Sequence, residues 1–300
     1  MSRNIGFAAL VAMTVGSASL AHALPLTVDP TSGWTLEGAL RPSLAPLGLG
    51  GHVNWTGFYV GVNGGGVWDG ATTAEVSTIY QVQNSYGGSS IVSVDGGGGG
   101  GFIGGAQVGY DFQWPFGLVT GLEADFQGLT NRTSGSLSTT ELLLGQGSIN
   151  AVKRVDDLGT VRLRFGYQIA PGLLTYATGG FAYGHAGLTG NTSLTSFDAN
   201  GNPMAGAASL LNYSAGRIGW AFGAGAEVPL WSNLTGKIEY LRYDLGTAYT
   251  VSPWVVNPTG SLGFAEQATV HFSGNVVRVG VNYRFGSDAP APLLPLVAKY

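Results

Sequence analysis

The segment from Phe102 to Trp114 alternates between large apolar residues and small or polar ones with almost no error. Successive side chains of a β-strand point to opposite faces, so this pattern predicts a strand with one apolar side and one wet side. It is longer than the usual strand of about five or six residues. It also covers the roughly 9–11 tilted residues that a β-strand needs to cross a bilayer.

The composition excludes several classes of protein. Charged residues make up 10% of the chain, where a typical globular protein has about 25%. The 13 Lys and Arg residues against 17 Asp and Glu leave no basic stripe, so we expect no nucleic-acid partner. The absence of cysteine excludes disulfides, thiolate chemistry and Cys-ligated zinc.

The N-terminus is typical of an export signal. Arg3 precedes an apolar stretch, Ile5–Leu20, and Ala21–Ala23 has the small-x-small pattern of a cleavage site. We expect residues 1–23 to be a signal peptide, and residues 24–54, with four prolines, to be a lead-in without a fold. No other stretch approaches the roughly 18 apolar residues of a membrane helix, so any membrane crossing would use strands.

Between residues 55 and 285 the alternation recurs, followed by a tail at 286–300. The expected strands cover 55–67, 102–114, 118–128, 157–168, 173–185, 215–228, 234–245 and 274–285. Three pairs are joined by short Pro-containing turns, and the remaining connections are long polar segments near 68–101, 129–156, 186–214 and 246–273. Short turns at one end and long loops at the other are typical of outer-membrane barrels. Since only closed barrels let strands span hydrocarbon, we expect an all-β, eight-stranded antiparallel up-and-down transmembrane β-barrel.

The charged residues of these strands fall on the face opposite the large apolar residues. We expect them to form a salt-bridge network that fills the lumen, which in an eight-stranded barrel is just wide enough for side chains. The network residues are Glu123, Asp125, Arg162, Arg164, Arg217, Glu227, Lys237, Glu239 and Arg278. Arg242 and Asp244 would face outward unless a bulge intervenes. Candidate aromatic anchors at the membrane interfaces are Trp55, Trp114, Tyr167, Tyr240 and Phe285.

Several stretches carry a family resemblance. They are Asn54–Gly65, Gly159–Gly166, Tyr176–Gly184, Lys237–Gly246, Val276–Phe285 and Val297–Tyr300. Together they resemble the porin-family barrels of alphaproteobacteria, immunogenic surface proteins related to the OmpA transmembrane domain. The resemblance implies a non-enzymatic barrel in the cell outer membrane, in contact with the lipid bilayer and lipopolysaccharide. Val279–Phe285 also resembles the C-terminal signal that the barrel assembly machinery recognises, although fifteen residues follow it here.

Three function classes stay open. We expect a structural or surface-interaction role with a filled or very narrow lumen, and the first alternative is a small-solute porin. The second alternative is a barrel hydrolase or acyltransferase that uses rim residues, namely His185, His271, Ser193, Ser273 and Asp244. No spacing singles out a catalytic triad, and the run Gly96–Gly101 lacks the Gly-Lys-Ser/Thr ending of a phosphate loop. We therefore assign no catalytic, cofactor-binding or metal-binding residue and expect no enzyme activity.

Overall fold

The computed structural model describes residues 53–69, 72–82, 85–96, 99–141, 145–195, 206–257 and 262–285. By its contacts the chain divides into Met1–Ser43 and Leu44–Tyr300, and all described residues belong to the second unit. The expected signal peptide, nearly all of the lead-in and the tail lie outside the described residues. Among the described residues, no helix is long and apolar enough to cross a membrane.

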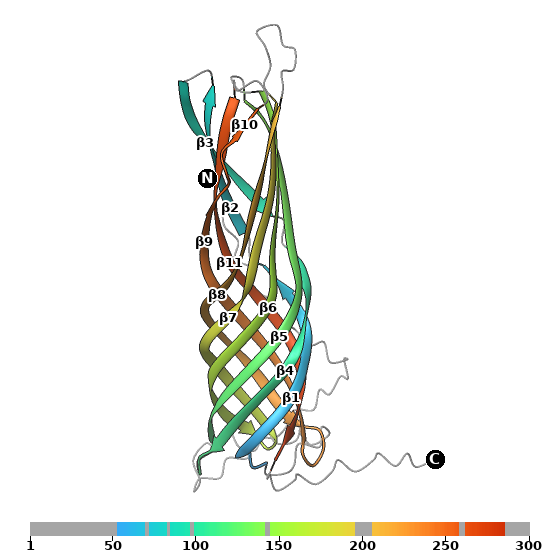
Figure 1. The fold of residues 1–300 in the computed structure, drawn as a ribbon. Coiled ribbons are helices and arrows are strands. Elements are labelled where there is room, and N and C mark those ends of the chain that lie inside the picture. Colours follow the sequence, from blue (N-terminus) through green and yellow to red (C-terminus); the bar gives the residue numbers. More distant parts are fainter. Residues whose placement is uncertain are drawn as a thin grey trace, which may run out of the picture. The chain divides into compact units, whose positions relative to one another are not determined.

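Eight antiparallel strands pair in chain order and close into a ring, because the last pairs back onto the first (Figure 1). The ring strands are β1 (Gly57–Trp68), β4 (Gly100–Gln113), β5 (Leu118–Glu141), β6 (Gly145–Ala170), β7 (Leu173–Thr195), β8 (Ala207–Pro229), β9 (Leu234–Val251) and β11 (Leu262–Arg284). Val62 of β1 pairs with Val281 of β11 at the closure. The predicted all-β antiparallel ring of eight strands is confirmed.

The expectation that the long connections are polar loops is wrong. β5 and β6 continue as a paired ladder to Glu141 and Gly145, and β7 and β8 stay paired out to Leu194 and Ala207. The first connection forms the hairpin β2 (Thr72–Val82) and β3 (Ser85–Gly96), and β2 pairs with the outer half of β11. The short strand β10 (Val255–Val256) also pairs with β11. We call β2, β3, β10 and the parts of the ring strands within residues 129–156, 186–214 and 246–273 the outer extension.

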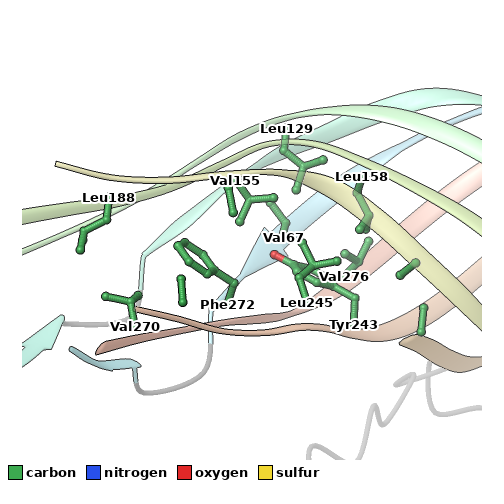
Figure 2. Packing of buried hydrophobic residues seen from close by; sticks show 14 of the residues in the cluster. Val67, Leu129, Val155, Leu158, Leu188, Tyr243, Leu245, Val270, Phe272 and Val276 are labelled. Atoms are coloured by element: carbon green, nitrogen blue, oxygen red, sulfur yellow. The ribbon is translucent and has the colours of Figure 1, made fainter. Parts of the chain in front are cut away.

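The outer extension is stabilised by packing between residues that are far apart in the chain, which the pattern of neighbouring residues does not reveal. Its alternating residues, such as Leu188, Leu211 and Phe272, are buried inside the ring. Strand formation depends on such cross-strand packing more than on intrinsic preference. Figure 2 shows this inner apolar cluster, in which side chains of β6 and β7 gather with those of β9 and β11. The cluster fills the ring from the outer half of the barrel into the outer extension.

The outward face of the ring is apolar. Exposed residues include Phe58, Val60, Val108, Leu122, Leu163, Phe165, Phe181, Phe222, Ile238, Val279 and Val281. This apolar band runs from Trp114, Tyr167 and Phe285 near the short turns to Phe102, Tyr183, Ile218 and Tyr240 at its outer edge. Phe181 and Tyr183 of β7 also point outward. Four of the five candidate interface aromatics are exposed, and Trp55 is not.

Trp55 lies inside the barrel mouth, which corrects its expected position in the first strand and at the membrane surface. β1 begins at Gly57, and Trp55 is fully buried with Val53, Val119, Leu174 and Tyr176, a group that we call the mouth cluster. Its backbone N–H donates to Gln113 Oε1 at 2.8 Å. Trp55 shares odd-numbered parity with the inward Tyr59, so period two already places it on the lumen side.

Candidate functional site

The candidate site is a charged layer within the ring, built by inward positions of six strands. Five carboxylates and five cations are nearly or fully buried there. The members of this ionic layer are Asp111, Glu123, Asp125, Glu227, Glu239, Arg162, Arg164, Lys237, Arg278 and Arg284. Strand register sets the first contacts, because Glu123 of β5 lies directly opposite Arg162 of β6.

Arg162 is the centre of the outer half of the ionic layer. Its Nη2 lies 2.7 Å from Glu123 Oε1 and 2.6 Å from Asp125 Oδ2, and its Nη1 lies 3.1 Å from Glu239 Oε1. Arg278 of β11 pairs with Asp125 at 2.8 Å and also with Glu239. Lys237 adds a third cation, with Nζ 2.9 Å from Glu123 Oε2. These contacts join strands on opposite sides of the lumen.

The half of the ionic layer nearer the mouth is organised around Arg164 and Arg284. Arg164 Nη2 lies 2.8 Å from Glu227 Oε2, and Arg284 Nη2 lies 3.0 Å from Asp111 Oδ2. The Tyr59 hydroxyl connects the two halves, since it donates to Glu123 Oε2 and accepts from Arg164 Nη1, both at 2.8 Å. The Arg164 guanidinium also stacks 4.0 Å from the ring centroid of Tyr176 in the mouth cluster.

The charges of the ionic layer are paired with one another. Five positive and five negative groups balance, and each cation contacts at least one carboxylate, as buried charges require. The mouth cluster covers the ionic layer on one side and the inner apolar cluster lies on the other. An eight-stranded ring has room for little beyond such side chains. The layer therefore acts as packing between strands.

Eight of the nine residues expected in the lumen network lie in the ionic layer. They are Glu123, Asp125, Arg162, Arg164, Glu227, Lys237, Glu239 and Arg278. Sequence reasoning missed Asp111, Arg284 and Tyr59, although Asp111 and Arg284 alternate in phase with the wet faces of their strands. Tyr59 also alternates in phase with the wet face of β1, but a tyrosine on the inward face reads equally well as apolar packing.

Arg217 is the exception, and it lies where two ring strands separate. β8 and β9 pair only from Trp220–Asp244 to Pro229–Thr235, so their outer parts diverge. Arg217 spans the start of this gap, donating from Nε to the Leu245 carbonyl at 3.2 Å and from Nη2 to the Thr247 carbonyl at 2.5 Å. Its side chain thus replaces ladder hydrogen bonds instead of joining the ionic layer.

The same point contains the bulge considered for Arg242 and Asp244. Two residues of β9, Leu245 and Gly246, oppose Phe272 alone between the pairs Thr247–His271 and Asp244–Ser273. Gly246 has a φ of 76°, which favours glycine, and its N–H donates to Asp244 Oδ1 at 2.8 Å. Because the bulge comes after Asp244, both Arg242 and Asp244 stay on the outward face.

Two His–Asp pairs lie on the outward face beyond the apolar band. His185 Nδ1 is 2.7 Å from Asp157 Oδ2, and His271 Nε2 is 3.0 Å from Asp244 Oδ2. The other His271 nitrogen faces the Thr247 hydroxyl at 3.0 Å. The serines considered as nucleophiles are engaged elsewhere.

Ser193 bonds to Ser148 at 2.8 Å, and Ser273 accepts from Arg242 at 3.3 Å. The structure therefore assembles no Ser–His–Asp triad from these residues. Among the described residues, no group of three or more His, Cys, Asp or Glu side chains is arranged to hold a metal ion.

Two buried ionisable groups belong to the outer extension. Burial lowers the pKa of Lys153, and its ion pair with Asp69 at 3.2 Å acts in the opposite direction. Burial raises the pKa of Glu266, which a hydrogen bond from Thr192 partly counteracts. Its Oε1 has no hydrogen-bond partner in the described part of the chain.

Fold and lumen together define an integral outer-membrane β-barrel with charged side chains packed inside. The chain belongs to the outer membrane protein beta-barrel domain family, whose profile matches residues 8–285. It is 35% identical over 247 residues to the "31 kDa outer-membrane immunogenic protein" of Brucella melitensis biotype 1, covering 81% of this chain and 88% of the relative. The protein of the same name from Brucella suis biovar 1 matches equally. The outer-membrane location and the family expected from the sequence are confirmed.

Solved barrels are more distant. OprG from Pseudomonas aeruginosa is 14% identical, with a TM-score of 0.35, over 78% of this chain and 98% of that one. The outer membrane protease OmpT from Escherichia coli is 10% identical, with a TM-score of 0.34 over the same shares. Likenesses of this size bear on neither activity nor partners.

Proposed function

We propose that this barrel has a structural and surface-interaction role in the outer membrane and conducts no solutes. The observation that carries the proposal is the ionic layer, in which ten buried and mutually paired side chains occupy the lumen. Moving a solute through would require separating ion pairs such as Arg162–Glu123 in a medium of low dielectric constant. The inner apolar cluster would oppose hydrated solutes as well.

Single-channel recording tests this proposal against the small-solute porin. We expect purified protein in planar bilayers to give no conductance steps, whereas a water-filled porin recorded in the same bilayers gives steady ones. Folding is verified beforehand by heat-modifiable migration in gels. A large, steady conductance from the folded protein would contradict the proposal.

We also propose that the barrel is not an enzyme. In support, the serines considered as nucleophiles bond to other groups in the described part of the chain, since Ser193 bonds to Ser148 and Ser273 accepts from Arg242. Phospholipase and palmitoyl-transfer assays on reconstituted protein should therefore show no turnover. Turnover that disappears in a His271→Ala variant would establish the barrel hydrolase or acyltransferase instead.

The surface role rests on the outer extension. In outer-membrane barrels the long connections face the exterior, and here they carry β2, β3, β10 and the outer parts of six ring strands. The Brucella relatives are named immunogenic proteins, and we propose that this extension is likewise a surface antigen. Antibodies raised against the purified barrel should label intact cells, and labelling that needs permeabilised cells would contradict the proposal.

Biogenesis forms part of the same proposal. Val279–Phe285 places alternate apolar side chains on the outward face of β11, with Val279, Tyr283 and Phe285 exposed. We propose that the barrel assembly machinery recognises this strand. Combined Tyr283→Ser and Phe285→Ser substitutions should reduce the amount of folded barrel in the outer membrane, and Phe58→Ser on β1 is the control. Equal loss in both variants would contradict a signal specific to β11.

A further inference from the structure

We propose that Arg242 and Asn275, at the outer edge of the apolar band, bind the phosphate of a lipid headgroup. Arg242 of β9 pairs with Asn275 of β11 across the ladder. Its Nη1 donates to Asn275 Oδ1 and its Nη2 donates to Ser273 Oγ, both at 3.3 Å. The Tyr240 hydroxyl donates to the same Asn275 oxygen at 2.7 Å. This headgroup site lies on the outside of the barrel, apart from the ionic layer.

The depth of the headgroup site follows from its neighbours along the strands. Toward the short turns, Ile238 and Val277 are outward and exposed members of the apolar band. On the other side, the next outward residues are Asp244 of β9 and Ser273 of β11, and His271 follows, with its Nε2 3.0 Å from Asp244 Oδ2. Arg242 is half-buried between them. The polar surface therefore begins at Arg242, which is the depth of lipid headgroups when the band lies in hydrocarbon.

Arg242, like Arg217, contacts no carboxylate in the described residues, but Arg242 lies on the outward face at the edge of the apolar band. Every cation of the ionic layer contacts a carboxylate, and Arg154 on the outer extension pairs with Asp156 at 3.3 Å. In the described ranges, the partners of Arg242 are a hydroxyl and an amide oxygen only. Asp244 is held by His271 and by the Gly246 N–H. A bound anion would therefore pair the charge of Arg242.

The free hydrogen-bond donors suit a phosphate group. A guanidinium has five N–H donors, and Arg242 directs only two of its hydrogen bonds to protein groups. The side-chain oxygen of Asn275 accepts two hydrogen bonds, and its NH₂ group remains available as a donor in the described structure. A planar guanidinium next to an amide donor matches the oxygens of a phosphate.

The surroundings favour a lipid phosphate over a free one. Trp68 of β1 pairs with Asn275 from the other side and is 41% exposed, as expected of an indole at headgroup depth. Directly beneath, exposed Val277, Val279 and Ile238 provide an apolar track along which acyl chains can lie. A phosphate bound at Arg242 thus places its attached chains against the barrel wall. This inference does not depend on whether the lumen conducts.

Native mass spectrometry of the folded protein in neutral detergent tests the headgroup site. The probes are phosphatidylglycerol, diphosphorylated lipid A and zwitterionic phosphatidylcholine, each added alone. We expect Arg242→Gln to lower the association constants of the two anionic lipids about fivefold, the contribution of one cation near a membrane surface. Asn275→Ala should cause a smaller loss, and phosphatidylcholine binding should change less in both variants.

Arg132→Gln is the matched control, because it removes the same charge from an exposed position on the outer extension. It should leave lipid binding unchanged. Equal loss in Arg132→Gln and Arg242→Gln would show a general charge effect and overturn the site, as would unchanged binding in Arg242→Gln. Inorganic phosphate is the last arm, and if it displaces the anionic lipids at millimolar concentration, the site is one for free anions and the proposal fails.

Discussion

Arg162 Nη2 of β6 lies 2.6 Å from Asp125 Oδ2 of β5, and neither side chain reaches solvent. The two residues come from adjacent strands, and Arg278 of β11 reaches the same carboxylate from farther round the ring. One carboxylate thus ties together three strands. The stability of the barrel should depend strongly on such shared partners.

Asp125→Ala should destabilise the barrel by about 3–5 kcal/mol, because it leaves buried Arg162 and Arg278 with too few carboxylates. Equilibrium unfolding by urea in lipid vesicles measures the change. The control is Asp156→Ala, which breaks an exposed pair with Arg154 and should cost about 1 kcal/mol or less. Similar losses in the two variants would contradict the role given to the ionic layer.

Gly109→Ala should destabilise the folded barrel by about 1–3 kcal/mol through overpacking. A Cβ at Gly109 would overlap the Tyr59 ring and lie 2.8 Å from the Leu122 carbonyl oxygen. Tyr59 cannot easily yield, since its hydroxyl is bonded to Glu123 and Arg164. Urea unfolding of Gly128→Ala is the comparison, because a Cβ there meets no atom within 4 Å. A neutral Gly109→Ala would show that the lumen has spare room.

Arg217→Met should loosen the outer part of β9 while leaving the membrane-spanning barrel intact. The substitution keeps much of the side-chain volume but removes the donors to the Leu245 and Thr247 carbonyls. An acceptor left without its donor costs about 1–3 kcal/mol. Hydrogen exchange should rise in residues 245–251 and stay unchanged in residues 234–243. Uniform exchange along β9 would show that Arg217 does not stabilise the divergence of the strands.

The outer end of β11 should be more stable in mild acid than at neutral pH. Burial raises the pKa of Glu266 in the folded state, above the value of about 4.3 in an unfolded chain. Its contribution is therefore fully present below about pH 4 and is lost as pH rises through the folded pKa. Hydrogen exchange of residues 262–270, corrected for intrinsic rates, measures this. Glu266→Gln should remove the dependence, and a persisting dependence would assign it to another group.

The ring and most of the ionic layer could be predicted from the sequence because both follow from period two. Once Leu163 and Phe165 are turned to lipid, Arg162 and Arg164 must face inward. Because a chain without helices can cross hydrocarbon only as a closed sheet, the strands must form a barrel. No information beyond the alternation of neighbouring residues is needed for these steps.

The outer extension and the strand divergence could not be predicted in this way. Leu188, Leu211 and Phe272 pack inside the ring although they are far apart in the chain. Arg217 alternates in phase with the inward residues of β8, yet the bulge at Gly246 brings backbone carbonyls within its reach. Trp55 was misplaced because its aromatic character outweighed its parity with Tyr59.

Thiol labelling of Thr178→Cys tests the sealed lumen most directly, since the chain has no cysteine. Thr178 is buried within the ring and accepts a hydrogen bond from Arg162 Nη1 at 3.4 Å. In vesicles, a charged water-soluble thiol reagent should leave Thr178→Cys unmodified until urea unfolds the barrel. It should modify Asn212→Cys, on the exposed face of the outer extension, at once. Modification of folded Thr178→Cys at the rate of Asn212→Cys would mean that water fills the lumen, and would contradict the account.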